Sequence, residues 1–208
     1  MRARGLWREA RLVSVDVETT GLDPQLDRVI SFGAVPIERG RIVAGNAVYG
    51  LVNPQRDLPP ESIVIHGIRP QDLLDAPTAP DALRPLAEIV RGAEVIAHAE
   101  WVERSFLSKP LRGLGARLPR KLLDTAQLYR LWEIEQHRPD PGFRSLGDVA
   151  AALGLPAHRP HHALGDALTT AQVFLALATH LERQGRKTVR GLRSADRVMR
   201  THSKYAPG

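Results

Sequence analysis

Two acidic residues, Asp16 and Glu18, stand at the end of a short apolar run and are followed at once by the Thr-Thr-Gly turn at 19–21. The run at 12–15, Leu-Val-Ser-Val, predicts a buried strand. Residues two apart in a strand point to the same face, so the two carboxylates project together. Like charges held this close repel each other unless a cation lies between them. The pair therefore indicates a site for a hard divalent cation, Mg²⁺ or Mn²⁺, at a strand end.

The composition limits which ligands and which compartments are compatible with the chain. The 208 residues are 43% hydrophobic and contain no cysteine, so thiolate metal sites and disulfides are excluded. No apolar stretch approaches the roughly 20 residues of a membrane span, and residues 1–5 lack the apolar core of a signal peptide. We therefore expect a soluble, cytoplasmic α/β protein that makes no contact with a membrane.

The positive charge is concentrated at the carboxyl end. The chain carries a formal net charge of +6, and residues from Arg183 onward include eight basic residues against one acid, Asp196. We predict a folded domain over residues 1–182, with its core at about 10–182, and a basic tail over 183–208. The tail can contact nucleic-acid phosphates or can be a solvated end, and the sequence leaves both open.

The apolar periodicity predicts strands and helices in an order typical of a mixed sheet flanked by helices. Five strands are expected, at 11–17, 28–36, 41–51, 93–97 and 121–124. Helices are expected at 79–91, 101–111, 125–132, 145–153 and 161–183, with shorter helical turns at 61–66 and 70–74. The fold class is therefore α/β, with a mixed five-stranded sheet.

Two acids, Glu100 and Glu103, open the helix that follows the strand at 93–97. Open α/β sheets usually place their ligand sites just past such a strand. The simpler explanation is that acids stabilise the first turn of a helix. Taken alone, these two residues favour that explanation.

A third acidic position, Asp166, follows the pair His161-His162 at the start of the long helix expected at 161–183. His161 and Asp166 lie on different faces if the helix is continuous, but His161 can still reach the acids from a preceding loop. Asp166 fits poorly as a helix cap if the helix starts near His161, and an unpaired buried acid is costly. By contrast, Asp124 is most simply the N-cap of the helix at 125–132.

In this order, the stretches resemble those of the DEDDh 3′–5′ exonucleases, the superfamily of proofreading exonucleases and ribonuclease T-like enzymes. The resemblance covers about residues 10 to 182 and implies an RNase H-like fold. It rests on five motifs: Val15–Leu22, Ile65–Ile68, Ala97–Leu107, Asp124–Thr125 and His161–Ala167.

The resemblance implies roles for individual residues. Asp16, Glu18 and Asp166 fall on family metal ligands, and His161 falls on the general base that takes a proton from the attacking water. Two divalent cations, Mg²⁺ or Mn²⁺, would be held by four carboxylates and would stabilise an in-line displacement at phosphorus. Contacts with the terminal nucleotide are implied for Thr19, Thr20, Gly21, Leu22, His66 and His98. For His66, a packed or surface histidine is an equal alternative.

The chain departs from the family at two positions of the second motif. Glu103 stands where the family has its fourth ligand, an Asp, and Ala99 stands where it has an Asn. Glu103 keeps the charge and adds one methylene, which puts metal affinity and rate in question more than the reaction. His162 occupies the position at which a sister subclass has Tyr, so the histidine subclass fits better.

The expected function is hydrolysis of phosphodiester bonds from nucleic-acid 3′ ends, with release of nucleoside 5′-monophosphates. The expected partner is DNA or RNA with a single-stranded 3′ end, and the sequence does not choose between the two nucleic acids. An alternative is a nucleic-acid-binding module or an epsilon-like accessory of a DNA polymerase with weakened catalysis. A homodimer is also compatible with the resemblance, because many small members of the superfamily dimerise.

Overall fold

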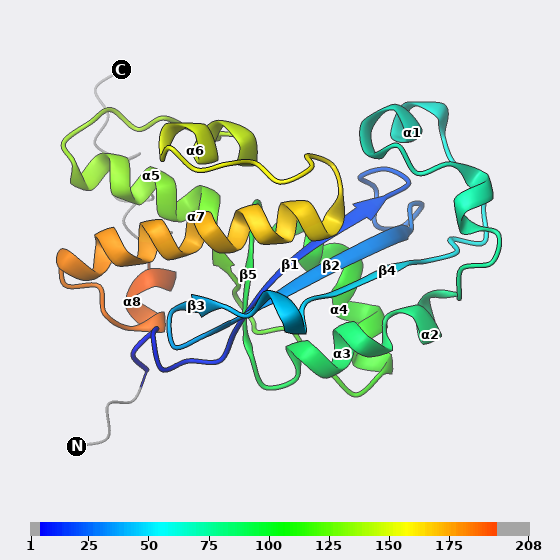
Figure 1. Ribbon diagram of the computed structural model, residues 1–208, viewed down its shortest axis with the longest axis horizontal. Helices are drawn as coiled ribbons and strands as arrows, with labels where there is room; N and C mark the ends of the chain where they lie inside the picture. The colour runs from blue at the N-terminus through cyan, green and yellow to red at the C-terminus, as the bar shows by residue number, and fades with distance from the viewer. Residues whose placement is uncertain (1–4, 195–208) are drawn as a thin grey trace.

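The computed structural model describes residues 5–194, and the rest of the expected basic tail, 195–208, lies outside the described residues. The strands are β1 (Leu12–Thr19), β2 (Val29–Glu38), β3 (Arg41–Ile42), β4 (Val48–Leu51), β5 (Glu94–Ala97) and β6 (Leu123–Asp124). The helices are α1 (Pro60–His66), α2 (Ala79–Ala82), α3 (Arg84–Val90), α4 (Trp101–Gly113), α5 (Thr125–Glu135), α6 (Leu146–Ala152), α7 (Ala163–Arg183) and α8 (Val189–Arg193) (Figure 1).

The strands between residues 5 and 194 form one mixed sheet in the order β3-β2-β1-β5-β6, with β4 also paired to β2. β1 is antiparallel to β2 and parallel to β5, and β5 is parallel to β6. The predicted α/β fold, with its mixed sheet flanked by helices, is thereby confirmed. The strand expected at 41–51 is divided by a 3₁₀ turn at Ala44–Asn46 into β3 and β4, which pair with different parts of β2. The described sheet therefore has six strands where five were expected.

β1 buries side chains on both of its faces, as a central strand must. Leu12 packs in a cluster with residues of α5, α6, α7 and α8, whereas Val13 and Val15 pack in a second cluster with residues of α3 and α4. Figure 1 shows α7 lying along the sheet with α5 and α6 beyond it. Even-numbered residues of β1 therefore face α7, and Asp16 and Glu18 continue that row at the carboxyl end of the strand.

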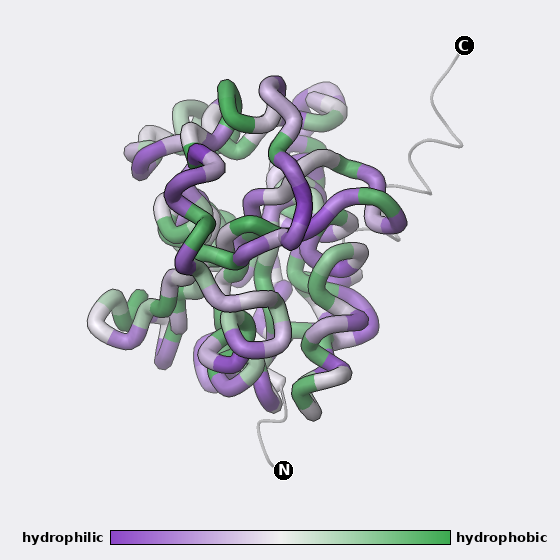
Figure 2. The backbone as a smooth tube through the Cα atoms, turned by 90° about the vertical axis from the view of Figure 1, so that its right-hand side faces the viewer, coloured by the Kyte–Doolittle hydropathy of each residue, from purple (hydrophilic) through white to green (hydrophobic). Residues whose placement is uncertain are grey.

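The helices follow the amphipathic pattern that covers a sheet. In Figure 2 hydrophobic and hydrophilic residues alternate along the helical turns. In α7 the buried residues include Ala167, Ala171, Phe174 and Leu181, which recur at helical spacing. The helix expected at 79–91 is instead split into α2 and α3 around Leu83, because Pro85 has no backbone N–H to continue the ladder.

Part of the expected basic tail packs on the body. Val189 and Leu192 of α8 are buried in the cluster that α7 also forms. The Trp7 backbone N–H donates to the carbonyl of Lys187 at 3.1 Å, and Arg186 forms an ion pair with Glu135 at 2.6 Å. The domain boundary after residue 182 stays a prediction. Among the described residues, no helix has the length and apolar character required to cross a membrane.

Candidate active site

Three carboxylates from two distant segments converge at the carboxyl end of β1. Asp16 and Glu18 come from β1, and Asp166 comes from the first turn of α7. One carboxylate oxygen of each residue lies within 4.8 Å of those of the other two, and all three side chains are half-buried. They line a cavity of about 280 Å³. Oxygen ligands grouped in this way are the donor set of a hard divalent cation.

Glu103 lies in the wall of the same cavity. It sits in the first turn of α4 and is 2% exposed. Its Oε2 atom is buried and has no hydrogen-bond partner among the described residues. A buried carboxylate oxygen left without a partner is costly, and this oxygen is available to a ligand. Glu103 thus shares a cavity with the three other acids, but it is not among the residues whose oxygens lie within 4.8 Å of one another, and its role as fourth ligand stays a prediction.

The segment that carries Glu103 is held by Asp124. As predicted, Asp124 is the N-cap of α5, where its side chain accepts the backbone N–H of Ala126 at 2.9 Å. The same carboxylate accepts the backbone N–H groups of Ala99 and Glu100, each at 3.2 Å. Glu100 turns away from the cavity and accepts the Leu122 N–H at 2.6 Å. Of the two acids that open α4, only Glu103 lines the cavity.

Ala99 adopts a backbone conformation that is unusual for alanine. Its φ is 58°, in the left-handed region, where Asn is enriched and other L-residues are strained. Asn, which the resemblance led us to expect at this position, adopts this conformation more readily than Ala.

Burial and mutual repulsion raise the pKa values of the clustered acids. Burial, together with the charges of Glu103, Glu18 and Asp166, raises the pKa of Asp16 well above its usual range. Burial and the Asp166 charge raise the pKa of Glu18 to about 7. Burial also raises the pKa of Glu103 and of Asp166. A bound divalent cation would reverse this effect, because it favours the charged form of each carboxylate.

His161 lies beside Asp166, outside the helix. Its φ is 60°, and α7 begins at Ala163 with His162 as its N-cap rather than at His161 as expected. The His161 backbone N–H donates to the Asp166 carboxylate at 2.8 Å. Asp166 therefore does make a capping contact, because the later helix start brings the preceding turn within reach. The exposed His161 side chain lines the cavity.

His162 has a structural role. Its Nδ1 accepts the Gly165 N–H at 3.4 Å, and its ring stacks on Tyr49 with centroids 4.7 Å apart. These contacts direct it away from the cavity, which it does not line. His162, at the position where the sister subclass has Tyr, therefore serves as the N-cap of α7.

His66 and His98 both line the cavity, but they differ in whether a ring nitrogen is left without a hydrogen-bond partner. The Nδ1 of His66 accepts the Ile68 N–H at 3.0 Å, so the proton of the neutral ring is on Nε2. That Nε2 is buried without a partner among the described residues. In His98, Nε2 lies 2.9 Å from the Arg144 carbonyl and Nδ1 lies 2.9 Å from the Thr125 hydroxyl. Only His66 therefore has a free donor for a ligand.

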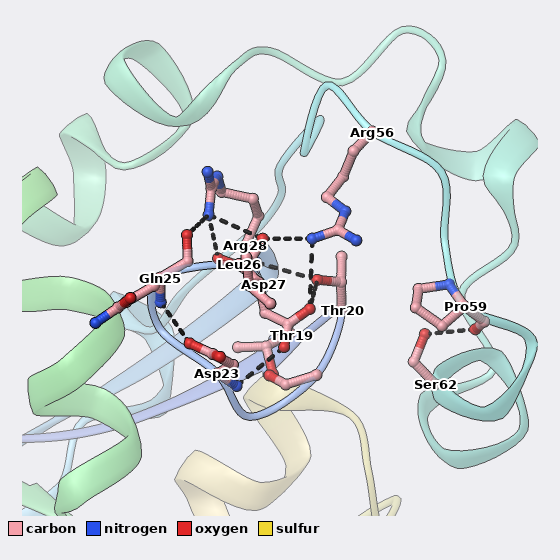
Figure 3. A network of polar contacts seen from close by, with 11 residues as sticks. Thr19, Thr20, Asp23, Gln25, Leu26, Asp27, Arg28, Arg56, Pro59 and Ser62 are labelled. Atoms are coloured by element: carbon pink, nitrogen blue, oxygen red, sulfur yellow. Dashed lines mark hydrogen bonds and ion pairs between the residues drawn. The ribbon is translucent and has the colours of Figure 1, made fainter.

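The turn after β1 is braced by a polar network that Figure 3 shows. Asp27 accepts the Thr20 hydroxyl at 2.8 Å and the Asp23 backbone N–H at 2.9 Å, and Arg56 pairs with it at 3.5 Å. Thr20 is buried in this network and does not line the cavity, whereas Thr19, Gly21 and Leu22 do. Of the four residues expected to contact substrate here, Thr20 instead holds the turn in place.

Further residues that the sequence did not single out as site residues also line the cavity. Ser62 and Ile65 come from α1, and Val102 comes from α4. Ile65 and Val102 lie within two of the motifs that carry the resemblance, whereas Ser62 lies outside all five and is brought to the end of β1 only by the packing of α1. A larger hollow of about 510 Å³ lies beyond the turn, with Arg28 and Lys109 in its lining, but it contains none of the four acids.

Comparison with known proteins gives consistent matches. A family model described as Exonuclease matches residues 13–174. The DNA polymerase III subunit epsilon-like protein of Rhodobacter capsulatus is 34% identical over 179 residues, which are 85% of this chain and 25% of that protein. The 3′-5′ exonuclease DinG of Bacillus subtilis is 30% identical over 187 residues, 88% of this chain and 19% of that protein. The chain thus spans a quarter or less of the length of these curated relatives.

Solved structures share the fold. Exonuclease X, in complex with 5′ overhanging duplex DNA, superposes with a TM-score of 0.66 at 24% identity, over 87% of this chain and 99% of its own. E. coli exonuclease I, in complex with a dT13 oligonucleotide, gives a TM-score of 0.69 at 15% identity, over 85% of this chain and 42% of its own. Likeness at this level of identity shows the RNase H-like architecture.

Proposed function

Because the chain belongs to the exonuclease family whose model spans residues 13–174, we propose that it is a metal-dependent 3′–5′ exonuclease. It would hydrolyse the terminal phosphodiester bond of a nucleic acid and release a nucleoside 5′-monophosphate. Its substrate would be DNA or RNA with a single-stranded 3′ end.

The observation that carries this proposal is the convergence of four acids on one cavity. Asp16, Glu18 and Asp166 offer oxygens within 4.8 Å of one another, and the buried Oε2 of Glu103 has no partner among the described residues. Four carboxylates balance the charge of two divalent cations, and oxygen donors suit Mg²⁺ or Mn²⁺. Two bound cations would balance the four negative charges and would give the unpaired Oε2 of Glu103 a partner. The four acids would hold these cations.

The divalent cations would supply electrostatic stabilisation of the attacking and leaving oxygens at phosphorus. The protein's own residues would do the rest. His161, exposed at the cavity and anchored through its backbone to Asp166, would take the proton of the attacking water. Imidazole is the side chain that most often serves as a general base near neutral pH.

The terminal nucleotide would lie against the turn after β1. Thr19, Gly21 and Leu22 line the cavity there, and the Nε2–H of His66 offers a hydrogen-bond donor to a phosphate or sugar oxygen. Leu22 is 63% exposed, so its apolar side chain is free to contact a base. Thr20 and His98 would act indirectly, Thr20 by bracing the turn and His98 by holding the loop at Arg144.

To test the proposal, the protein is incubated with an oligonucleotide labelled at its 5′ end, in one set of reactions with Mg²⁺ or Mn²⁺ and in another with excess EDTA. We expect a ladder that shortens from the 3′ end, nucleoside 5′-monophosphates as product, and no reaction in EDTA. Asp16→Asn should abolish turnover, whereas the matched change Asp75→Asn, at an exposed loop position, should not. Internal cleavage, 3′-monophosphate products or undiminished turnover by Asp16→Asn would contradict it.

A further inference from the structure

A dense run of positive charge follows Glu103 along the chain. Residues 104–121 contain six basic residues and no acid. The basic residues are Arg104, Lys109, Arg112, Arg117, Arg120 and Lys121. This concentration lies within the folded body, apart from the basic tail, and it begins immediately after an acid of the candidate active site.

The fold gathers these charges into one surface. Arg104, Ser108 and Arg112 are four residues apart in α4, so they share one face of the helix. The loop at 114–121 returns beside this face, since Arg104 Nη1 donates to the carbonyl of Arg120 at 2.7 Å. We call the exposed or half-exposed residues Arg104, Arg112, Arg117 and Arg120 the basic stripe.

The basic stripe contains a hollow suited to an anion. Ser108 and Leu118 line a cavity of about 320 Å³ together with Arg112 and Arg117. The stripe starts at Arg104, one residue after Glu103. Arg112 lies eight residues further along α4, which corresponds to about 12 Å along the helix axis. A ligand that extends out of the active site along α4 would therefore pass over it.

The charge of the stripe is largely uncompensated. Arg104 has a carboxylate near it, that of Glu100 at 3.8 Å. Within residues 5–194, Arg112 and Arg117 have no ion pair, whereas exposed arginines such as Arg69 and Arg84 each pair with an Asp three residues away. Arg112 also suits the helix C-terminus, but the helix dipole does not account for Arg117 or Arg120, which lie in the loop.

We propose that the basic stripe binds the phosphates of the nucleic-acid strand upstream of the 3′ end held at the active site. This inference rests on the proposed function, because it assigns the path of that same substrate. Arg side chains contact phosphate oxygens without reading sequence, so the contact would be independent of base identity. Its effect would be retention of strands long enough to reach from the acids to the stripe.

The double variant Arg112→Gln/Arg117→Gln tests the proposal without touching the acids. In an Asp16→Asn background, binding of a fluorescent 20-nucleotide single strand is measured by anisotropy between 50 and 200 mM salt. Two lost phosphate contacts should lower the slope of log K against log salt by about 1.4 and weaken binding about tenfold at low salt. The matched control is Arg39→Gln/Arg41→Gln, which removes the same charge from the turn at the opposite end of β2.

Equal weakening by the control pair would overturn the proposal, because net charge alone would then explain binding. An unchanged salt slope in the stripe variant would overturn it too. In the catalytically intact chain, the stripe variant should slow degradation of the 20-nucleotide strand at low substrate concentration while changing the rate on a dinucleotide less than twofold. Because the binding assay needs no turnover, a chain without exonuclease activity would still report on the stripe, so failure of the two proposals can be told apart.

Discussion

The backbone of Leu164 lies directly over Gly33, where a Cβ atom on the glycine would meet the Leu164 nitrogen and Cα at 2.4 Å. Gly33 is also the cross-strand partner of Asp16 in the β1–β2 pairing. The missing side chain therefore lets α7 begin against the sheet beside Asp16. Asp166, two residues further along α7, thereby reaches the carboxylates of β1.

Gly33→Ala should accordingly damage the site as well as the fold. The new methyl group meets backbone, which must shift, and overpacking of this kind costs about 1–3 kcal/mol. Asp166 would move with the start of α7, so turnover should fall by more than the lost stability explains. Denaturant unfolding and turnover with Mn²⁺ measure the two effects. Gly113→Ala, where a Cβ meets nothing within 4 Å, is the control, and a normal Gly33→Ala enzyme would contradict this account.

Glu103→Gln should separate stability from activity. Burial raises the pKa of Glu103 to about 8, so the metal-free Glu103→Gln protein should melt at a higher temperature than the unmodified chain above that pH, where Glu103 would carry a buried charge. Loss of the carboxylate should lower turnover on the order of 100-fold, and Glu103→Asp should retain more activity than Glu103→Gln. Glu100→Gln makes the same change three residues earlier, outside the cavity. Similar losses from Glu100→Gln and Glu103→Gln would rule out the ligand role.

His161→Gln should slow hydrolysis by about 10²- to 10⁴-fold if the imidazole is the general base. The Asp166 contact uses the backbone N–H of His161, so the substitution leaves it in place. The loss of rate at acidic pH that protonation of a general base causes should also disappear. A pH–rate profile at saturating Mg²⁺ measures this. His180→Gln, on α7 far along the helix, is the control, and an unchanged profile for His161→Gln would exclude the assigned role.

Ala99→Gly should stabilise the protein, because Ala99 has a φ of 58° and glycine adopts this conformation without strain. The expected gain is about 0.5–1 kcal/mol, and Ala99→Asn should gain somewhat less. Ala47→Gly, at a φ of −68°, should instead lose stability, and it serves as the control. Denaturant midpoints distinguish the two signs. A loss on Ala99→Gly would show that the backbone is not strained there.

The metal-free protein should lose stability as the pH rises from about 6.5 to 8. Burial raises the pKa of Glu18 to about 7, well above the ordinary value of an exposed Glu, so the folded state binds more protons than the unfolded state in this range. His66 and His98, whose pKa values burial lowers, contribute the opposite slope only below about 6.5. Melting temperatures in EDTA should therefore fall over this window.

Saturating Mg²⁺ should remove or reverse that fall, because cation binding requires the deprotonated carboxylates. The double variant Asp16→Asn/Glu18→Gln should show a flatter profile in EDTA than the unmodified chain. A slope that neither Mg²⁺ nor this variant changes would assign the pH dependence to other groups.

Features that depend on neighbours along the chain could be predicted from the sequence. Alternation in β1 placed Asp16 and Glu18 on one face, and the Asp-Thr pair at the end of β6 identified Asp124 as a helix cap. The mixed sheet and its flanking helices followed from the order of apolar segments. These features were predictable because the period of a strand and the unpaired N–H groups of a helix start are local properties.

The contacts between side chains from distant segments were revealed by the folded structure. It turned Glu103 rather than Glu100 into the cavity, buried Thr20 against Asp27, and packed α8 of the expected tail on the body. The resemblance implied that Asp166 joins Asp16 across 150 residues of chain, but the close approach of α7 to Gly33 that accompanies this meeting is visible only in the structure. Such contacts depend on shape and burial between distant segments, and no local pattern of residues encodes them.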